Sequence, residues 1–327
     1  METELKKIVH KTFSKSEIGR EIIYNYKKYT NRLPVPDMKF PELISLETAS
    51  ACNLHCVHCP PHMLEYKHEV RKFGILNIDL FYKLMDEIDK FGERRIALHK
   101  DGEPLMHPNI IEIFKRLKKK REHNVYLTTN AHRLTEGISE AILKYKINIV
   151  NFSLGASTEK FYSKVRGNDF NKVISNILNF MKMRKYSEWQ PKVIVQIIEL
   201  PEYPEMKDEI KQFKKFWKDF NVEVQVWEKL TWGVYKNNNK FKNRYPCYQL
   251  WETVTVNSDG LASACCMDWR QQLIIGDAKN ETIEEIWHGE KLKYLREMHI
   301  AGNENELPIC DSCNYWNWHD KLENYPL

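Results

Sequence analysis

CNLHCVHC, residues 52–59, carries three cysteines at the spacing C-x3-C-x2-C. The mainly apolar run just before it, residues 43–47, predicts a short strand, so the cysteines stand on the loop that follows a strand. Thiolates this close can hold one iron–sulfur cluster, because a tight loop turns the sulfurs to one side. In a cubane, three thiolates leave one iron without a protein ligand, and a substrate or cofactor can bind there.

Zinc is the alternative occupant of this loop. Cys52, Cys56 and Cys59 would supply three ligands, and His55 or His58 could supply the fourth. Zinc knuckles usually complete four ligands locally, which favours the cluster, but the residue types leave both interpretations open.

Composition is that of a globular protein of one large domain or two. The 327 residues are 42% hydrophobic and 29% charged, and the net charge of +5 (50 basic minus 45 acidic residues) does not favour a nucleic-acid partner. No apolar run approaches the ~20 residues that span a membrane, and the N-terminus has no signal-peptide core, so we expect no membrane partner and a cytoplasmic location. In a reducing compartment, eight cysteines favour metal or cluster ligation over disulfides.

Strand and helix patterns alternate through the first two thirds of the chain. Six predicted strands cover residues 43–47, 95–99, 124–128, 147–153, 192–198 and 222–226, and the helices between them cover about 80–88, 110–117, 135–145, 171–184 and 206–219. This alternation predicts an α/β fold with parallel strands and right-handed crossovers. An open doubly wound sheet and a partial barrel both fit six repeats, and the site would lie at the C-terminal strand ends.

Polar residues follow several of these predicted strands. Asp101, Gly102 and Glu103 come after the second strand, and Asn130 comes after the third. Ser153 ends the fourth strand, and Arg166 follows it. A carboxylate pairs well with an ammonium group, and a guanidinium grips a carboxylate in a fork. Each of these residues also has a structural interpretation, as a turn or as part of the core.

The last third carries five cysteines: Cys247, Cys265, Cys266, Cys310 and Cys313. The turn at 257–260 contains Asp-Gly between two strand-like runs, 252–256 and 261–264, which predicts a hairpin. A helix with a capping box at Thr282–Glu285 should follow and carry Ile286, Trp287, Leu292 and Leu295. We therefore expect a helical extension (1–40), a barrel (41–228), a linker (229–246) and a small hairpin-plus-helix domain (247–327).

The cysteine loop closely resembles the signature of radical S-adenosylmethionine (radical SAM) enzymes. The resemblance implies an incomplete (β/α)6 barrel, a [4Fe–4S] cluster on Cys52, Cys56 and Cys59, and SAM chelated at the open iron. Reductive cleavage then yields a 5′-deoxyadenosyl radical. Asp101–Gly102–Glu103 stands where the family has GGE, which binds the SAM amino group, with Asp in place of the first Gly. Ser153 and Arg166 match residues that contact SAM, and Asn130 and His58 are expected beside it.

The C-terminal part resembles the SPASM/twitch extension of that family. The match comprises Cys247, Gly260 and Cys265 at their spacing, closed by Cys310 and Cys313, which implies four thiolates for one auxiliary [4Fe–4S] cluster. A structural zinc ion is the alternative. If Cys265 is the ligand, Cys266 is free, either as a buried small residue or as a hydrogen-atom donor.

The resemblance implies a function as well. The favoured hypothesis is an oxidoreductase that removes a hydrogen atom from an aminocyclitol or sugar-like alcohol, with the auxiliary cluster accepting an electron. The alternatives are an epimerase that uses Cys266, a peptide-modifying enzyme, and a non-catalytic cluster scaffold. A flavodoxin or ferredoxin is the expected electron donor.

Overall fold

The computed structural model describes residues 39–66, 71–234, 244 and 246–318. The predicted extension 1–40 falls outside these residues except at 39 and 40. Residues 235–243 and 245 of the predicted linker and residues 319–327 also lie outside them. Among the described helices, none combines the length and the apolar character that crossing a membrane requires.

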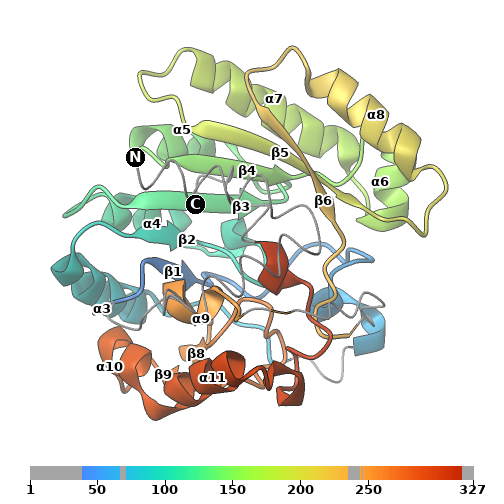
Figure 1. The fold of residues 1–327 in the computed structure, drawn as a ribbon. Coiled ribbons are helices and arrows are strands. Elements are labelled where there is room, and N and C mark those ends of the chain that lie inside the picture. The colour runs from blue at the N-terminus through green and yellow to red at the C-terminus, as the bar shows by residue number, and fades with distance from the viewer. Residues whose placement is uncertain (1–38, 67–70, 235–243, 245, 319–327) are drawn as a thin grey trace, which may run out of the picture.

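One sheet runs through the described molecule (Figure 1), in the order β6-β5-β4-β3-β2-β1-β7-β8-β9. Its first six strands are parallel neighbours: β1 (Leu43–Leu46), β2 (Arg95–Ala97), β3 (Asn124–Thr129), β4 (Ile149–Ser153), β5 (Lys192–Glu199) and β6 (Glu223–Glu228). β6 and β9 are the two edges, so the sheet does not close. The predicted partial (β/α)6 barrel is confirmed.

Helices follow the first five strands close to where the sequence predicts them. They are α3 (Ile78–Ile88), α4 (Ile110–Leu117), α5 (Glu136–Lys144), α7 (Phe170–Lys185) and α8 (Met206–Trp217). The short helix α6 (Glu159–Val165) before α7 was not predicted; Thr158 begins it by accepting a hydrogen bond from the Phe161 amide. Single 3-10 turns occur at Pro60–His62, Leu64–Tyr66, Asp89–Phe91, Pro104–Met106, Glu304–Glu306 and Tyr315–Trp318.

The C-terminal part extends the barrel's own sheet. Its elements are α9 (Gln249–Glu252), β7 (Thr253–Val256), β8 (Leu261–Ser263), β9 (Ile274–Asp277), α10 (Ile283–His288) and α11 (Glu290–Ala301). β7 and β8 form the predicted hairpin, and β7 also pairs in parallel with β1 along its whole length. The orange and red elements in Figure 1 therefore lie directly against the blue start of the barrel.

The predicted single helix after Thr282 is wrong in one respect. The capping box is present, with Thr282 and Glu285 bonding each other's backbone amides. Gly289, however, is extended (φ −68°, ψ 152°) and divides the segment into α10 and α11. The apolar periodicity continues across this break because both helices pack on the same core.

Strand alternation separates two cores. Ile44, Ile96, Val125, Val150 and Val193 belong to the large core that includes the residues of the covering helices. Their neighbours pack together on the opposite, inner face of the barrel as an apolar layer, made of Leu43, Ala97, Tyr126, Ile149 and Ile194. This layer is the floor on which the site described below is built.

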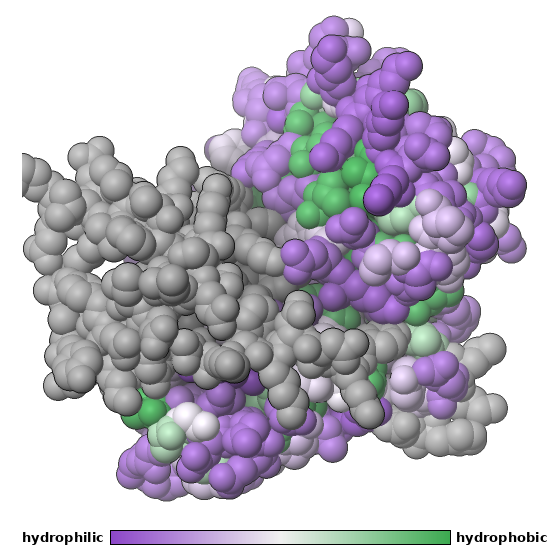
Figure 2. All heavy atoms as spheres, turned by 45° about the vertical axis from the view of Figure 1, so that its right-hand side comes forward, coloured by the Kyte–Doolittle hydropathy of each residue, from purple (hydrophilic) through white to green (hydrophobic). Residues whose placement is uncertain are grey.

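The surface in Figure 2 is mainly hydrophilic where it is described. A hydrophobic area lies in its upper part, which holds α7, α8 and β6 in Figure 1. Phe216 of α8 is among the exposed large hydrophobic residues of the chain.

A buried ion cluster joins α3 to α4. Arg116 of α4 donates to Asp89 (2.8 Å) and to Asp86 (2.7 Å), and His123 bonds the other oxygen of Asp89 (2.8 Å). The side chain of Asp89 is 7% exposed, whereas that of Asp86 is 58% exposed. The two carboxylates thus share one arginine in very different surroundings.

Replacing Asp89 should cost far more stability than replacing Asp86. Asp89→Ala leaves the Arg116 charge buried beside a histidine that has lost its partner, which typically costs about 3–5 kcal/mol. Asp86→Ala, the matched control, removes a solvent-screened pair worth about 1 kcal/mol at most. Urea unfolding of the anaerobic protein measures both, and equal losses would contradict the assignment.

Candidate functional site

A single cavity gathers the predicted site residues at the C-terminal ends of the parallel strands. It is lined by Cys52, Cys56, His58, Cys59, Asp101, Gly102, Glu103, Asn130, Ser153, Arg166 and Cys266. These residues come from the loops after β1, β2, β3 and β4 and from the C-terminal part. Parallel strands bring such loops to one edge, which is why residues so distant in sequence meet.

The cysteine loop is fixed by backbone and side-chain bonds. The Val57 amide donates to Val165, and the Cys59 amide donates to Cys56. The Asn130 amide group lies 3.8 Å from the Cys52 sulfur. Burial, with the nearby Glu103 carboxylate, raises the pKa of the Cys52 thiol to about 12. A thiol held this way becomes a thiolate only with a compensating positive charge, which bound iron supplies, so the loop fits a cluster.

Arg166 is a buried cation beside these thiols. Burial disfavours its charge, but Cys56, Tyr162 and Cys52 act in the other direction and raise its pKa. Its guanidinium donates to the Ser153 hydroxyl (3.3 Å), and within the described part of the chain its buried Nε has no partner. Gly155 makes room for it, because a Cβ there would stand 2.8 Å from the guanidinium. Arg166 is thus prepared to receive a carboxylate.

Glu103 is a buried carboxylate held by three donors. They are the Thr129 hydroxyl (2.6 Å), the Asn130 amide (2.7 Å) and the Leu105 amide (3.0 Å). Burial raises its pKa, and these three bonds oppose that rise. A carboxylate has about four lone-pair positions, so one remains for an ammonium group.

Gly102 is required by a close approach of two backbones. A Cβ at this position would stand 2.3 Å from the Ala49 carbonyl oxygen and 2.6 Å from that of Ala51. The Glu103 amide also donates to Ala51 (3.0 Å). The turn after β2 therefore lies directly on the chain that leads into Cys52.

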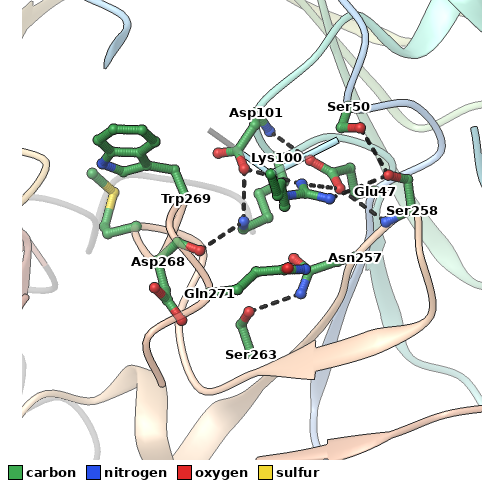
Figure 3. A network of polar contacts seen from close by, with 12 residues as sticks. Glu47, Ser50, Lys100, Asp101, Asn257, Ser258, Ser263, Asp268, Trp269 and Gln271 are labelled. Atoms are coloured by element: carbon green, nitrogen blue, oxygen red, sulfur yellow. Dashed lines mark hydrogen bonds and ion pairs between the residues drawn. The ribbon is translucent and has the colours of Figure 1, made fainter. Parts of the chain in front are cut away.

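Asp101 belongs to a buried network of four charges (Figure 3). Its carboxylate bonds Lys100 (2.7 Å) and Arg71 (3.1 Å), and Arg71 also pairs with Glu47. Glu47 accepts from the Ser258 amide (2.8 Å), at the turn of the C-terminal hairpin. Both cations bond the same oxygen, Oδ2, and Oδ1 is buried without a partner among the described residues.

Lys100 extends this network to the second cysteine group. It donates to the Asp268 carbonyl (3.0 Å), three residues after Cys265 (Figure 3). The side chains of Lys100, Asp101 and Glu47 are 0%, 2% and 0% exposed. The network thus ties the loops of both cysteine groups together in a place that water does not reach.

His58 lines the same cavity without a described role in this network. Burial, and the charges of Arg166 and Lys229, lower its pKa to about 3. Its Nδ1 is buried and has no partner among the residues that the structure describes. His58 is therefore neutral.

Four other thiols share a second cavity. Cys247, Cys265, Cys310 and Cys313 line it. Burial raises the pKa of Cys310 to about 12 and raises that of Cys247 and Cys313 as well. Four thiols that line one cavity fit an auxiliary cluster, because bound iron would stabilise their thiolates as in the first cavity. Cys266, next to Cys265, lines the first cavity instead.

The two cavities share a wall. Gln249, Met267 and Tyr315 line both of them. Within the described residues no group of three His, Cys, Asp or Glu side chains is placed to hold a single metal ion. Zn–S bonds of about 2.3 Å require sulfurs closer together than a four-iron cluster does.

Comparison with known families agrees with this geometry. The model of the radical SAM superfamily matches residues 46–212, which is about half of the chain. The chain belongs to the radical SAM superfamily. A second model, the SPASM iron–sulfur cluster-binding domain, matches residues 247–314. This radical SAM protein therefore has a [4Fe–4S] cluster, SAM and an auxiliary iron–sulfur cluster as its cofactors.

Curated relatives match in part. GTP 3′,8-cyclase of Listeria welshimeri is 28% identical over 196 residues, 59% of this chain and 55% of that protein. The tungsten-containing aldehyde ferredoxin oxidoreductase cofactor-modifying protein of Pyrococcus furiosus is 31% identical over 110 residues, 33% of this chain and 29% of that protein. The chain thus spans about half the length, or less, of these two relatives.

Solved structures share the fold over most of the chain. BtrN in complex with AdoMet and 2-DOIA has a TM-score of 0.56 at 18% identity, covering 84% of this chain and 92% of that one. Native anSMEcpe with bound AdoMet has a TM-score of 0.61 at 15% identity, covering 86% and 96%. Streptococcus suis SuiB bound to precursor peptide SuiA has a TM-score of 0.61 at 14% identity, covering 84% and 71%.

Several residues of the first cavity were not predicted from the sequence. Gln249 and Thr253 line it from the C-terminal part, His99 lines it from the segment just after β2, and Asn151 lines it from β4. His99 and Asn151 lie within the predicted strands 95–99 and 147–153, so the alternation of side chains along those strands could have indicated that they face the inside of the barrel. Nothing in the sequence indicates Gln249 and Thr253, because only the β1–β7 pairing brings them to the barrel.

A methyl group at Gly102 should displace the cysteine loop. Gly102→Ala forces the turn after β2 away from the chain at 49–51, because no space is free between them. That chain leads into Cys52, so we expect the iron content to fall by the share that the first cluster holds. Gly137→Ala is the matched control, because a Cβ there meets nothing within 4 Å. Iron per chain after anaerobic reconstitution measures the effect, and full iron loading of Gly102→Ala would contradict it.

Proposed function

We propose that this chain is a radical SAM oxidoreductase that acts on a polar small molecule. The first cluster and SAM, when bound, supply a 5′-deoxyadenosyl radical, and the auxiliary cluster supplies an electron acceptor. A flavodoxin or ferredoxin would deliver the electron that starts the cycle. The chain's own residues bind SAM, enclose the substrate and separate the two cluster sites.

The shared wall between the two cavities carries this proposal. Oxidation by removal of one hydrogen atom leaves an odd electron, which needs an acceptor near the substrate. Tyr315, Met267 and Gln249 each line both the barrel cavity and the cavity of the four thiols. One layer of side chains therefore lies between the proposed substrate and the proposed acceptor.

SAM would be held by two opposite charges. Arg166 would grip its carboxylate, since its guanidinium is buried and has an unpaired Nε. Glu103 would accept from its ammonium group at the remaining lone-pair position. Cys52, Cys56 and Cys59 would hold the cluster, with Asn130 donating toward the Cys52 sulfur.

An epimerase is the second candidate. Cys266 lines the barrel cavity, whereas its neighbour Cys265 lines the second cavity with the three other thiols. A thiol in that place could return a hydrogen atom to a substrate radical. Peptide modification is the third candidate. Structures of anSMEcpe and SuiB contain bound peptides, but their likeness to this chain extends to the fold alone.

Formation of 5′-deoxyadenosine tests the proposal. The anaerobically reconstituted chain, given SAM and dithionite, should release 5′-deoxyadenosine, and the triple variant Cys52→Ala, Cys56→Ala, Cys59→Ala should release none. The matched control is Cys310→Ala with Cys313→Ala, which removes two ligands of the other cavity and should keep SAM cleavage. Cleavage that survives the triple variant would refute the proposal.

Cys266→Ala separates the two candidates. An oxidoreductase should keep most of its product formation, because this side chain is no ligand in our assignment. An epimerase should lose its inverted product while 5′-deoxyadenosine is still formed. Chiral chromatography of the product, with deuterium incorporation from D2O, distinguishes the two results.

A further inference from the structure

The inner part of the barrel cavity holds polar atoms that no group of the described chain satisfies. Four of them are Nδ1 of His99, Oδ1 of Asn151, Oε1 of Gln249 and Oγ1 of Thr253, all buried. The others belong to His58, Asp101 and Arg166, which stand on the cysteine loop or beside it. All four residues line the cavity. Asn151, Gln249 and Thr253 are only 2–3% exposed as whole residues. A buried polar atom without a partner is costly, so these atoms indicate a ligand that supplies the missing hydrogen bonds.

These four atoms can all accept a hydrogen bond. Both N–H groups of Asn151 are already donated, to the Tyr126 hydroxyl (3.0 Å) and to Gln196 (2.7 Å), which leaves its oxygen as an acceptor. The free atom of Gln249 is likewise a carbonyl oxygen. Burial lowers the pKa of His99 to about 4, so its ring is neutral and Nδ1 accepts when Nε2 carries the proton. The hydroxyl of Thr253 both accepts and donates.

Three of the four residues adjoin the apolar floor of the cavity. The His99 ring contacts the Tyr126 ring edge-on, with centroids 5.2 Å apart, and Tyr126 bonds Asn151. Thr253 pairs in register with Leu43, which belongs to the apolar floor together with Tyr126. Gln249 and Thr253 thus face the barrel from the side that the C-terminal part covers.

The two lysines that line this cavity already have partners. Among the described lining residues, Lys100 pairs with Asp101 (2.7 Å) and Lys229 pairs with Glu202 (2.7 Å). Arg166 lies beside the cysteines, where SAM would use it. A phosphate or carboxylate of a substrate, which only accepts hydrogen bonds, would therefore meet acceptors and no spare cation.

We infer that His99, Asn151, Gln249 and Thr253 form a substrate subsite for a compact ring rich in hydroxyl or amino groups, which excludes anionic substrates. This inference rests on the proposed small-molecule function and names the residues that would select the substrate. The C-terminal part thereby has a second role, since it contributes specificity through Gln249 and Thr253.

Three probes with one ring test the chemistry. They are myo-inositol, an amino-deoxy-inositol and myo-inositol 1-phosphate, titrated calorimetrically into the reconstituted, SAM-loaded protein. We expect the first two to bind and the phosphate to bind at least about tenfold more weakly. The inference is overturned if myo-inositol 1-phosphate binds more tightly than the other two probes. It is also overturned if neither myo-inositol nor the amino-deoxy-inositol binds. The first two probes show whether hydroxyl groups alone suffice.

Thr253→Val and Thr255→Val form a matched pair. Both threonines lie buried on β7 with an unpaired hydroxyl, but only Thr253 lines the cavity. Loss of one hydrogen bond should weaken binding of the preferred ring about three- to tenfold in Thr253→Val and not in Thr255→Val. Gln249→Met is a second isosteric variant with the same expected loss. Equal affinities in both threonine variants would overturn the inference.

The 5′-deoxyadenosine assay on the same preparations separates the two proposals. If SAM is cleaved but the probes bind in the wrong order, the subsite is wrong and the proposed function stands. If SAM is not cleaved, the proposed function is wrong, and the subsite loses its basis.

Discussion

The parallel ladder between β1 and β7 is the contact on which the arrangement of this protein depends. β1 pairs with β2 on one side and with β7 on the other, so neither of its edges is free. The ladder continues past β1, because the Glu47 amide donates to Val256 (2.9 Å). Shortly afterwards the chain reaches Cys52. A change of strand register would shift one strand by a whole residue and turn its side chains to the other face of the sheet. The β1–β7 pairing therefore fixes the position of the C-terminal thiols relative to Cys52, Cys56 and Cys59.

The buried charges secure the same junction. Glu47 and Asp101 balance Arg71 and Lys100, so the group of four is neutral as a whole. A single unpaired charge in such a place costs several kcal/mol, and this penalty opposes any separation of the loops. Asp101, which stands where the resembling family has glycine, therefore has a structural role visible in its contacts. Its neighbour Gly102 keeps the backbone contact that the turn requires.

The cavity is built in layers that follow from strand alternation. The floor is apolar, the middle layer carries neutral hydrogen-bonding groups, and the thiols with Glu103 and Arg166 stand at the strand ends. The charged side chains of Glu103 and Arg166 thus lie near the cofactor sites and away from the apolar floor. The C-terminal part covers the open side of this cavity and adds its own cysteines behind a wall one side chain thick.

The sequence alone determined the local features of this protein. The spacing of Cys52, Cys56 and Cys59, the alternation of strands and helices, the hairpin turn and the capping box all depend on residues close in the chain. Glu103 and Arg166 were expected near the cysteine loop because they match residues of the resembling family, and because the strand ends that they follow must meet.

Only the tertiary structure decided the rest. The β1–β7 pairing, the network around Asp101 and the entry of Gln249 and Thr253 into the barrel join residues as far as 211 positions apart, and such contacts leave no period in a sequence. The division of Cys265 and Cys266 between two cavities is likewise invisible in the sequence, because two adjacent identical residues differ only in where the folded backbone directs them.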